Sequence, residues 1–302
     1  MTTRARDRVA VIGRANIDLT IRLQHLPSAG RTAFGSALNS TAGGKALNQA
    51  VAVGRLGGRP QLIANAGADQ WGERLRTAVM DAGVDTEHFT LVDGASTAAA
   101  VIQVTPNGES YVSLALSPAT ELTATSISQA LTQHLPDVIV AQLDLQPEAA
   151  RAALQTVRPR LLIGNLLPHP DFDRQLLAEL DVFVVNEHEA AAVLGAADID
   201  AEDAAAELRQ LGPDIVIVTA GAKGAFYHGR GTAGKIPAIP VTVVDTSGAG
   251  DAFLGAFALD FSGGQDVAKA ARAGVHVASI AVQQHGALLL PGRVPAPEVA
   301  LA

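Results

Sequence analysis

Residues 181–194 read DVFVVNEHEAAAVL, and this stretch shows the pattern from which the whole chain is built. Its first part, Asp181–Val185, is apolar after the aspartate rather than alternating, which is typical of a strand covered on both faces. The alanine-rich part after Asn186 favours a helix, because alanine loses no side-chain entropy there. The stretch therefore predicts a buried strand followed directly by a helix.

The same unit recurs along the chain. Further buried strands are predicted at 8–12 (RVAVI), 137–140 (DVIV), 161–163 and 214–219 (DIVIVT), and helices at 44–57, 69–82, 147–157, 187–194, 202–211, 248–262 and 265–284. Strands and helices that alternate over this length predict a parallel sheet with helices on both faces. We expect one α/β domain over residues 1–302, a three-layer α/β/α sandwich with a mostly parallel central sheet.

Two stretches, 17–23 (IDLTIRL) and 98–116, alternate apolar and polar residues instead. The second contains Thr105-Pro106-Asn107-Gly108, which is a turn sequence. They predict a small antiparallel sheet that emerges from the N-terminal half at about 14–40 and 96–118 and exposes one face to solvent. Such a sheet has an edge and an apolar face to cover, so we expect a lid that also forms a homodimer. An ordinary edge hairpin is the alternative.

Composition excludes several classes of function. The chain has 302 residues, a net charge of −8, no Cys and only four Lys, so cysteine chemistry and a basic nucleic-acid surface are excluded. No run approaches the ~18 apolar residues of a membrane-spanning helix, and the apolar run 9–12 is too short for a signal peptide. We expect a cytoplasmic protein without membrane or nucleic-acid partners. The eight His show no zinc-site spacing, which predicts no histidine metal site.

The most informative motif for chemistry is 241–255, VTVVDTSGAGDAFLG. A predicted strand, Val241–Val244, leads into Gly248-Ala249-Gly250 and then into an apolar helix that begins near Asp251. Glycines let backbone N–H groups point outward, and the helix N-terminus adds partial positive charge, so the turn is a ready anion site. Asp251 suits a general base that deprotonates a hydroxyl as it attacks phosphorus, although compensation of the helix dipole would also explain it.

Two common glycine-loop motifs do not fit. The dinucleotide fingerprint G-x-G-x-x-G needs a third glycine where this chain has Phe253. The phosphate loop G-x-x-x-x-G-K-[ST] needs a hydroxyl residue where Ala46 follows Lys45, and Ala46 cannot bind magnesium.

Polar residues at two other places suit a sugar. In 41–57 (TAGGKALNQAVAVGRLG), Gly43 and Gly44 let a ligand approach the backbone, Lys45 can reach a phosphate or hydroxyl, and Asn48 suits vicinal hydroxyls. The alternative is a capped surface helix. Asn16 and Asp18 follow the first strand on one face and could clamp a polyol, or simply form a solvated strand face.

Two strand ends suit a nucleotide and its metal. Asn186 and Glu189 follow a buried strand, where ligands bind in open α/β sheets, and Glu189 could hold hydrated magnesium. A helix-capping box explains the same pair equally well. Thr219, Gly221 and Gly224 end the next strand and could cradle nucleotide phosphates or ribose, or form a tight turn.

These motifs together resemble the ribokinase-like sugar kinases of the phosphofructokinase-B superfamily. The two family signatures correspond to 43–50 (GGKALNQA) and 245–253 (DTSGAGDAF), and the supporting motifs occur in the family's order over nearly the whole chain. The resemblance implies ATP as phosphoryl donor, magnesium as cofactor and a sugar as acceptor. It assigns Asp251 as base and the amides of Gly248, Ala249 and Gly250 as anion hole.

The resemblance also assigns the binding residues. Sugar contacts fall on Asn16, Asp18, Gly43, Gly44, Lys45, Asn48 and, more weakly, Asp144; nucleotide contacts on Asn186, Thr219, Gly221 and Gly224; magnesium on Glu189, through water; and a monovalent cation on Asp245 and Ser247.

Three departures from the family pattern bear on specificity. Ala46-Leu47 replaces Gly-Ala beside the sugar, and 113–120 (SLALSPAT) lacks the family's Gly-Ala-Asn segment. Leu290 stands in place of a serine, which argues against potassium activation and against ribose itself.

The expected acceptor is the primary hydroxyl of a pentose such as ribose. A nucleoside kinase on the same scaffold is one alternative, but the lid offers few aromatics for a base (Phe34, Phe89, Tyr111). A sugar sensor without catalysis is the other.

Overall fold

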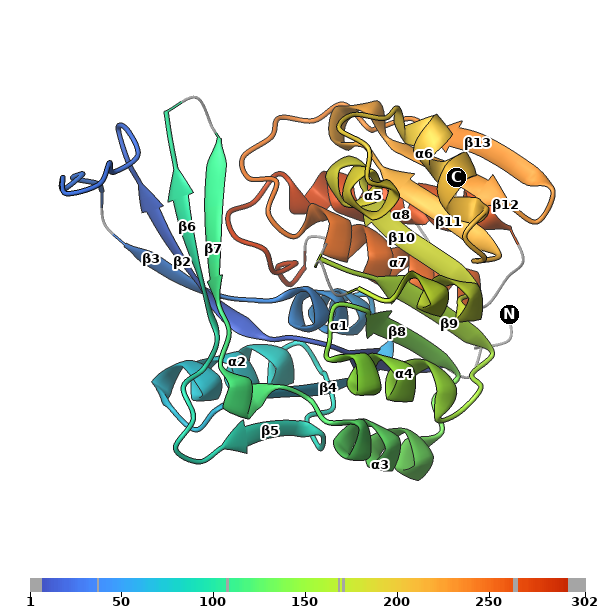
Figure 1. The fold of residues 1–302 in the computed structure, drawn as a ribbon, viewed down its shortest axis with the longest axis horizontal. Helices are drawn as coiled ribbons and strands as arrows, with labels where there is room; N and C mark the ends of the chain where they lie inside the picture. The colour runs from blue at the N-terminus through green and yellow to red at the C-terminus, as the bar shows by residue number, and fades with distance from the viewer. Residues whose placement is uncertain are drawn as a thin grey trace.

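The computed structural model describes residues 7–36, 38–106, 109–167, 169, 172–262 and 266–292. They form a nine-stranded sheet, which we call the body sheet, and a separate four-stranded sheet, which we call the lid (Figure 1). The order of the body sheet is β13-β12-β11-β10-β9-β8-β1-β4-β5. Its seven strands from β11 to β5 run parallel, and β12 and β13 form an antiparallel edge. The expected sandwich with a mostly parallel sheet is confirmed.

The body strands are β1 (Arg8–Ile12), β4 (Arg59–Gly67), β5 (Phe89–Val92), β8 (Val138–Gln142), β9 (Leu161–Asn165), β10 (Val182–Asn186), β11 (Ile215–Thr219), β12 (Ala225–Gly229) and β13 (Thr232–Ile236). The α-helices are α1 (Lys45–Arg55), α2 (Gln70–Met80), α3 (Ala124–His134), α4 (Pro147–Gln155), α5 (Glu187–Leu194), α6 (Ala201–Arg209), α7 (Ala249–Ser262) and α8 (Val267–Ala281), and the 3₁₀ turns are η1 (Pro118–Thr120), η2 (Arg174–Glu179) and η3 (Gly221–Lys223).

Successive residues of the body strands enter two different cores. In β1, Val9 and Val11 pack with α1, α2, α7 and α8, whereas Ala10 and Ile12 pack with α3, α4, α5 and α6. Both faces of the sheet are therefore covered, which is why its central strands are mostly apolar rather than alternating.

The lid consists of β2 (Asn16–Arg22), β3 (Asn39–Gly43), β6 (Ala99–Val104) and β7 (Ser110–Ala115), in the order β3-β2-β6-β7. It stands away from the body in Figure 1. Two of its pairings are antiparallel, but β2 and β6 run parallel, so the lid is a mixed sheet. Every residue of β7 is exposed. Asn107 and Gly108 of the expected turn lie outside the described residues.

The strand predicted at Val241–Val244 is wrong. The segment follows β13, has no partner strand among the described residues and exposes 57% of Val243. Four consecutive residues of high β-propensity cannot form a strand without a neighbouring strand to bond to. Instead, Val244 N–H donates to the carbonyl of Val282, at the end of α8 (2.8 Å).

Several elements were not predicted from the sequence: strands β3, β4, β5, β12 and β13, and helix α3. The Gly43-Gly44 turn therefore ends a lid strand as well as beginning α1. None of the described helices is both long enough and apolar enough to cross a membrane.

The fold places the site at a crevice in the body sheet. The chain continues from β1 to β4 on one side, whereas β8 lies on the other side of β1. Loops leave the carboxyl ends of β1 and β8 in opposite directions, and such a reversal opens a ligand site in open α/β sheets.

Candidate active site

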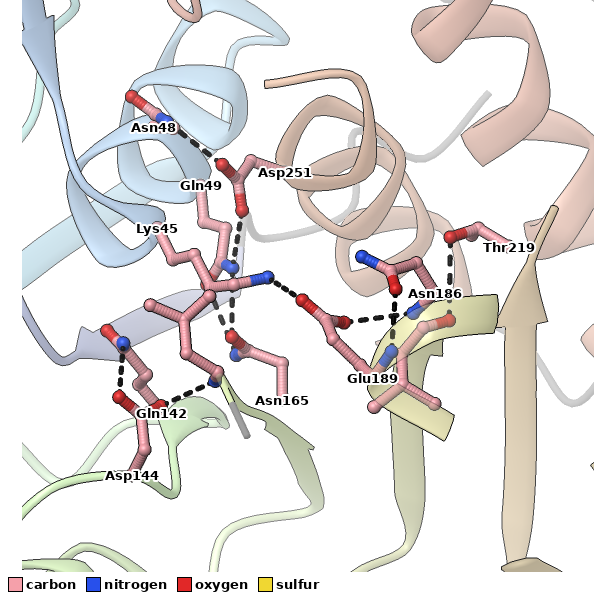
Figure 2. A network of polar contacts seen from close by, with 12 residues as sticks. Lys45, Asn48, Gln49, Gln142, Asp144, Asn165, Asn186, Glu189, Thr219 and Asp251 are labelled. Atoms are coloured by element: carbon pink, nitrogen blue, oxygen red, sulfur yellow. Dashed lines mark hydrogen bonds and ion pairs between the residues drawn. The ribbon is translucent and has the colours of Figure 1, made fainter. Parts of the chain in front are cut away.

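The centre of the site is the carboxylate of Asp251, in the first turn of α7. It is 8% exposed and accepts two hydrogen bonds from α1: Oδ2 from Asn48 Nδ2 and Oδ1 from Gln49 Nε2, each at 2.9 Å (Figure 2). Burial raises the pKa of Asp251 above its usual value, and Lys45 with these two hydrogen bonds only partly opposes this. A carboxylate with a raised pKa is well matched to accepting a proton near neutral pH.

The turn before Asp251 has the expected anion-binding geometry. Gly248 has φ +71°, and a Cβ there would lie 2.1 Å from the carbonyl oxygen of Ala287, so only glycine fits. Among the described residues, none accepts a hydrogen bond from the amides of Gly248 or Gly250. Ala249 N–H differs, because it donates to Thr246 O at 3.3 Å. Two free amides thus stand at the beginning of α7.

The loop behind this turn is braced by Asp245. Its Oδ1 accepts from Ser247 N–H (2.9 Å) and its Oδ2 from Gly286 N–H (3.0 Å). Burial raises the pKa of Asp245, but these hydrogen bonds outweigh burial, and the pKa lies below its usual value. Asp245 is therefore an anion that holds the loop to the chain near Gly286.

Lys45 and Glu189 join the two predicted binding regions. Lys45 begins α1, and its Nζ donates to Glu189 Oε1 at 2.7 Å. Burial lowers the pKa of Lys45, but Glu189 and Asp251 raise it further, so the ammonium stays charged. Asn186 and Glu189 form the capping box of α5, with Asn186 Oδ1 accepting from Glu189 N–H (2.8 Å) and Glu189 Oε2 from Asn186 N–H (2.9 Å).

Asn16 and Asp18 share one face of β2, as predicted. Asn16 Nδ2 donates to Asp18 Oδ1 at 2.7 Å. A Cβ on Gly43 would lie 2.2 Å from Asp18 Oδ2, so the glycine makes room for this carboxylate. Gly44 is equally constrained, with φ +97° and the carbonyl of Arg14 close by. Burial, together with Asp251 and Asp245, raises the pKa of Asp18 to about 6 against the hydrogen bond from Asn16.

A cleft of about 450 Å³ opens between the lid and the loop after Asp245. This volume is within the usual range for small-molecule sites. Its lining comes from lid residues and from two loops of the body: Asp18, Thr20, Arg22, Asn39, Ser40, Thr41, Ile102, Asp245, Ser247, His285, Gly286 and Ala287. The lid therefore supplies one wall of the cleft and the body the other.

The nucleotide residues predicted from the sequence lie beside Glu189. Thr219 ends β11 directly opposite Asn186 of β10, and its Oγ1 donates to Val185 O at 3.4 Å. Gly221 and Gly224 form the turn into β12, at φ +49° and +96°. A Cβ on Gly224 would lie 2.0 Å from the carbonyl of Ile236, so this glycine is required by the turn itself.

Asp144 lies at the edge of the site, and its carboxylate is already engaged. Arg14 Nη1 and Gln142 Nε2 (3.1 Å) donate to Oδ2, and Leu167 N–H (2.8 Å) donates to Oδ1. The guanidinium of Arg14 also binds both oxygens of Glu121, at 3.1 Å each. Arg14 precedes the first lid strand and Glu121 follows the last, so this ion-pair network spans the base of the lid.

Sequence reasoning missed three polar residues of the site: Arg14, Gln49 and Asn165. Asn165, at the end of β9, accepts from Gln49 Nε2 at 3.2 Å and so supports the residue that holds Asp251. The polar pair Asn48-Gln49 in a helix that is otherwise mostly apolar could have indicated Gln49. Arg14 could not have been found locally, because its partners lie 107 and 130 residues away.

The site thus brings together a buried carboxylate, free amides and a charged lysine near a cleft. The family model described as pfkB family carbohydrate kinase matches residues 6–291. The chain belongs to this family of carbohydrate kinases. It is an ATP-dependent sugar kinase, which is a transferase.

Individual relatives extend over nearly the whole kinase. The ribokinase of Haemophilus influenzae is 30% identical over 288 residues, which cover 93% of this chain and 94% of that protein. The deoxyribokinase of Salmonella typhi is 30% identical over 286 residues, covering 92% and 93%. The crystal structure of a ribokinase from Thermotoga maritima has a TM-score of 0.83 to this chain at 27% identity, covering 97% and 98%.

Proposed function

We propose that this kinase transfers the γ-phosphoryl group of ATP to the primary hydroxyl of ribose or a closely related pentose. The observation that carries the proposal is Asp251, a buried carboxylate with a raised pKa next to the free amides of Gly248 and Gly250. The names of the relatives, ribokinase and deoxyribokinase, support a pentose as acceptor.

In the proposed reaction, Asp251 accepts the proton of the sugar hydroxyl as its oxygen bonds to the γ-phosphorus. The bond from that phosphorus to the bridging oxygen breaks, and ADP leaves with the bonding electron pair. The free amides of Gly248 and Gly250 and the ammonium of Lys45 stabilise the charge on the transferred group. Gln49 and Asn48 orient the base until the sugar displaces one of these hydrogen bonds.

We assign the sugar to the lid side of the cleft and the nucleotide to the body side. The residues assigned to the sugar are Asn16, Asp18, Gly43, Gly44, Lys45 and Asn48, with Asp144 at the pocket edge, where Arg14 holds it. The residues assigned to the nucleotide are Asn186, Thr219, Gly221 and Gly224. On this assignment the lid, residues 16–43 and 99–115, and the body act as one catalytic domain.

The carboxylate of Glu189, beside Lys45, suits magnesium that enters with ATP. Glu189 offers a single carboxylate, and magnesium prefers one or two carboxylates with water and phosphate oxygens. Bound there, the metal would neutralise phosphate charge. Both carboxylates already accept hydrogen bonds: Glu189 from Lys45 Nζ and Asn186 N–H, and Asp245 from Ser247 and Gly286 N–H. A contact through water needs only a remaining lone pair on Glu189, whereas direct potassium binding at Asp245 would compete with the N–H groups that hold its loop. We therefore assign Asp245 and Ser247 a structural role.

The test is ADP release with MgATP over a panel of ribose, 2-deoxyribose, other pentoses, hexoses and nucleosides. Ribose or 2-deoxyribose should give the highest kcat/KM. Highest activity with a nucleoside would replace the pentose proposal. Tight sugar binding without turnover by any acceptor would identify a sensor instead. The lid has few aromatic side chains that could stack on a nucleoside base. Phe34 and Tyr111 are exposed in the lid. Phe89 was expected in the lid, but it is buried in the body core.

We also propose that the enzyme is cytoplasmic, where ATP is available. The lid supports the further proposal of a homodimer. Among the described lid residues, large apolar or aromatic side chains are exposed at Phe34, Leu38, Tyr111, Val112 and Leu114. A face of this kind usually packs against another surface. Light scattering should show a dimer that Val112→Asp converts to monomer, whereas Thr77→Asp on α2 should leave it dimeric. A wild-type monomer at micromolar concentration would contradict the dimer.

A further inference from the structure

The structure brings together two histidines and a glutamate that are far from the active site. Glu87 and His88 immediately precede β5, and His134 is the last residue of α3. The two segments lie side by side at the bottom of the view in Figure 1. One potential ligand atom from each of the three side chains lies within 4.8 Å of the other two. The imidazole rings are 5.1 Å apart between centroids and nearly perpendicular.

The nitrogen atoms of this cluster lack the hydrogen bonds that buried polar atoms normally make. Nε2 of His88 and Nε2 of His134 are both shielded from solvent, and neither makes a hydrogen bond to a described residue. His134 Nε2 lies 3.3 Å from Glu87 Oε2, whose other oxygen accepts from Gln133 Nε2 at 2.8 Å. The buried Nε2 of His88, which has no partner among the described residues, carries a free-energy cost that a bound ligand would remove.

We propose that Glu87, His88 and His134 form a binding site for a divalent transition-metal ion such as Zn²⁺. Two imidazoles and a carboxylate are ligands that zinc uses, with water completing the tetrahedron. Imidazole nitrogen selects zinc, copper or nickel over magnesium, which requires oxygen ligands, so this site differs in chemistry from the nucleotide site. The side chains must close by rotation, because zinc–nitrogen bonds are only about 2.0–2.1 Å long.

The position of the cluster predicts what metal binding does. It joins the end of α3 to the start of β5, across 46 residues of sequence. His134 directly precedes the connection into β8, at the edge where the body strands begin, whereas Asp251 and Glu189 lie at the opposite edge. Binding should therefore stabilise the folded chain and leave the sugar kinase reaction unchanged.

This proposal departs from the expectation, drawn from histidine spacing, that no histidine metal site forms. Spacing rules detect ligands within one helix or loop. These ligands come from two elements that only the tertiary structure brings together.

The test is isothermal titration of the full chain, without an affinity tag and previously treated with a chelator, with ZnCl₂ in the absence of nucleotide. One equivalent of zinc should bind, and the midpoint of thermal unfolding should rise. Glu87→Gln, His88→Ala and His134→Ala should each weaken binding at least tenfold. The matched control is His25→Ala, an exposed histidine outside the cluster, which should bind zinc like the wild type.

A second measurement keeps the test independent of folding defects. Co²⁺ bound to the wild type should give the visible absorption of a site with nitrogen ligands, and Glu87→Gln, at an exposed position, should reduce it. Absence of stoichiometric zinc binding by the wild type would overturn the proposal. Wild-type affinity in all three variants would also overturn it, since zinc would then bind elsewhere.

Discussion

The body and the lid are both sheets, but they use their residues in opposite ways. Body strands such as β9 are buried at every position, whereas β7 of the lid is exposed at every position. On the proposed function, the body supplies the groups for phosphoryl transfer, and the lid supplies Asn16 and Asp18 for the sugar. The comparison teaches that the packed body can hold reacting groups in fixed positions. The lid, which is exposed along β7, can instead form a wall that binds the acceptor sugar. Substitutions in the body should therefore change mainly kcat, and substitutions in the lid mainly KM for the sugar.

The largest difference between the body and the lid is expected in the steady-state kinetic constants. Asp251→Asn, in the body, should lower kcat by roughly 10²–10⁴-fold, because the general base is lost. Asp18→Asn, in the lid, should mainly raise KM for the sugar, by about tenfold or more, because a charge-assisted hydrogen bond is lost. Steady-state kinetics with MgATP measure both. Near-normal kcat in folded Asp251→Asn would remove the base assignment and the division of roles with it.

The next difference is in stability. Phe257 is fully buried in α7 and stacks between Phe253 and Phe261, with centroids at 6.2 and 5.1 Å. Phe257→Ala should cost about 3–5 kcal/mol of unfolding free energy, because it leaves a cavity. Ser113→Ala on the lid, where the side chain is exposed, should cost less than about 0.5 kcal/mol. Denaturant unfolding of both variants gives the comparison, and equal losses would contradict it.

The junction between the two regions should show an intermediate effect. Arg14→Gln leaves Glu121 and the nearly buried Asp144 without their cation, which should cost about 3 kcal/mol. KM for the sugar should rise as well, because the base of the lid is loosened. The matched control is Arg76→Gln, which breaks a solvent-exposed pair with Glu73 and should cost no more than about 1 kcal/mol. If both variants unfold alike, the Arg14 network does not hold the lid.

The last difference is a dependence of stability on pH. Burial raises the pKa of Asp18 to about 6 in the folded chain, above its unfolded value of 3.8. The folded state therefore binds more protons between these values, and ionising Asp18 costs stability as pH rises through about 6. The unfolding midpoint of Asp18→Asn, relative to wild type, should be higher at pH 7.5 than at pH 4.

A matched carboxylate shows whether burial is the cause of this effect. Asp93 is exposed, so Asp93→Asn should show no such change between the two pH values. A constant difference between Asp18→Asn and wild type at both pH values would contradict the raised pKa.

Much of this fold and site could be predicted because the signals are local. The helix predicted at 187–194 is α5 with the same bounds, and its capping box forms as expected, since caps involve residues three apart. The Gly248 turn and the polar face of Asn16 and Asp18 were also predicted. In contrast, the strand predicted at Val241–Val244 does not form, because a strand needs a neighbouring strand that the local sequence does not specify.

The sequence by itself determined the alternation of strands and helices, the glycine turns and the resemblance to sugar kinases, because periodicity, capping and turn chemistry act over a few residues. Only the tertiary structure decided which strands pair, that Gln49 holds Asp251, that Arg14 joins both ends of the lid, and that His88 meets His134. These contacts join residues 46 to 202 positions apart. They form only after the chain has folded around its two cores, so short-range patterns carry no trace of them.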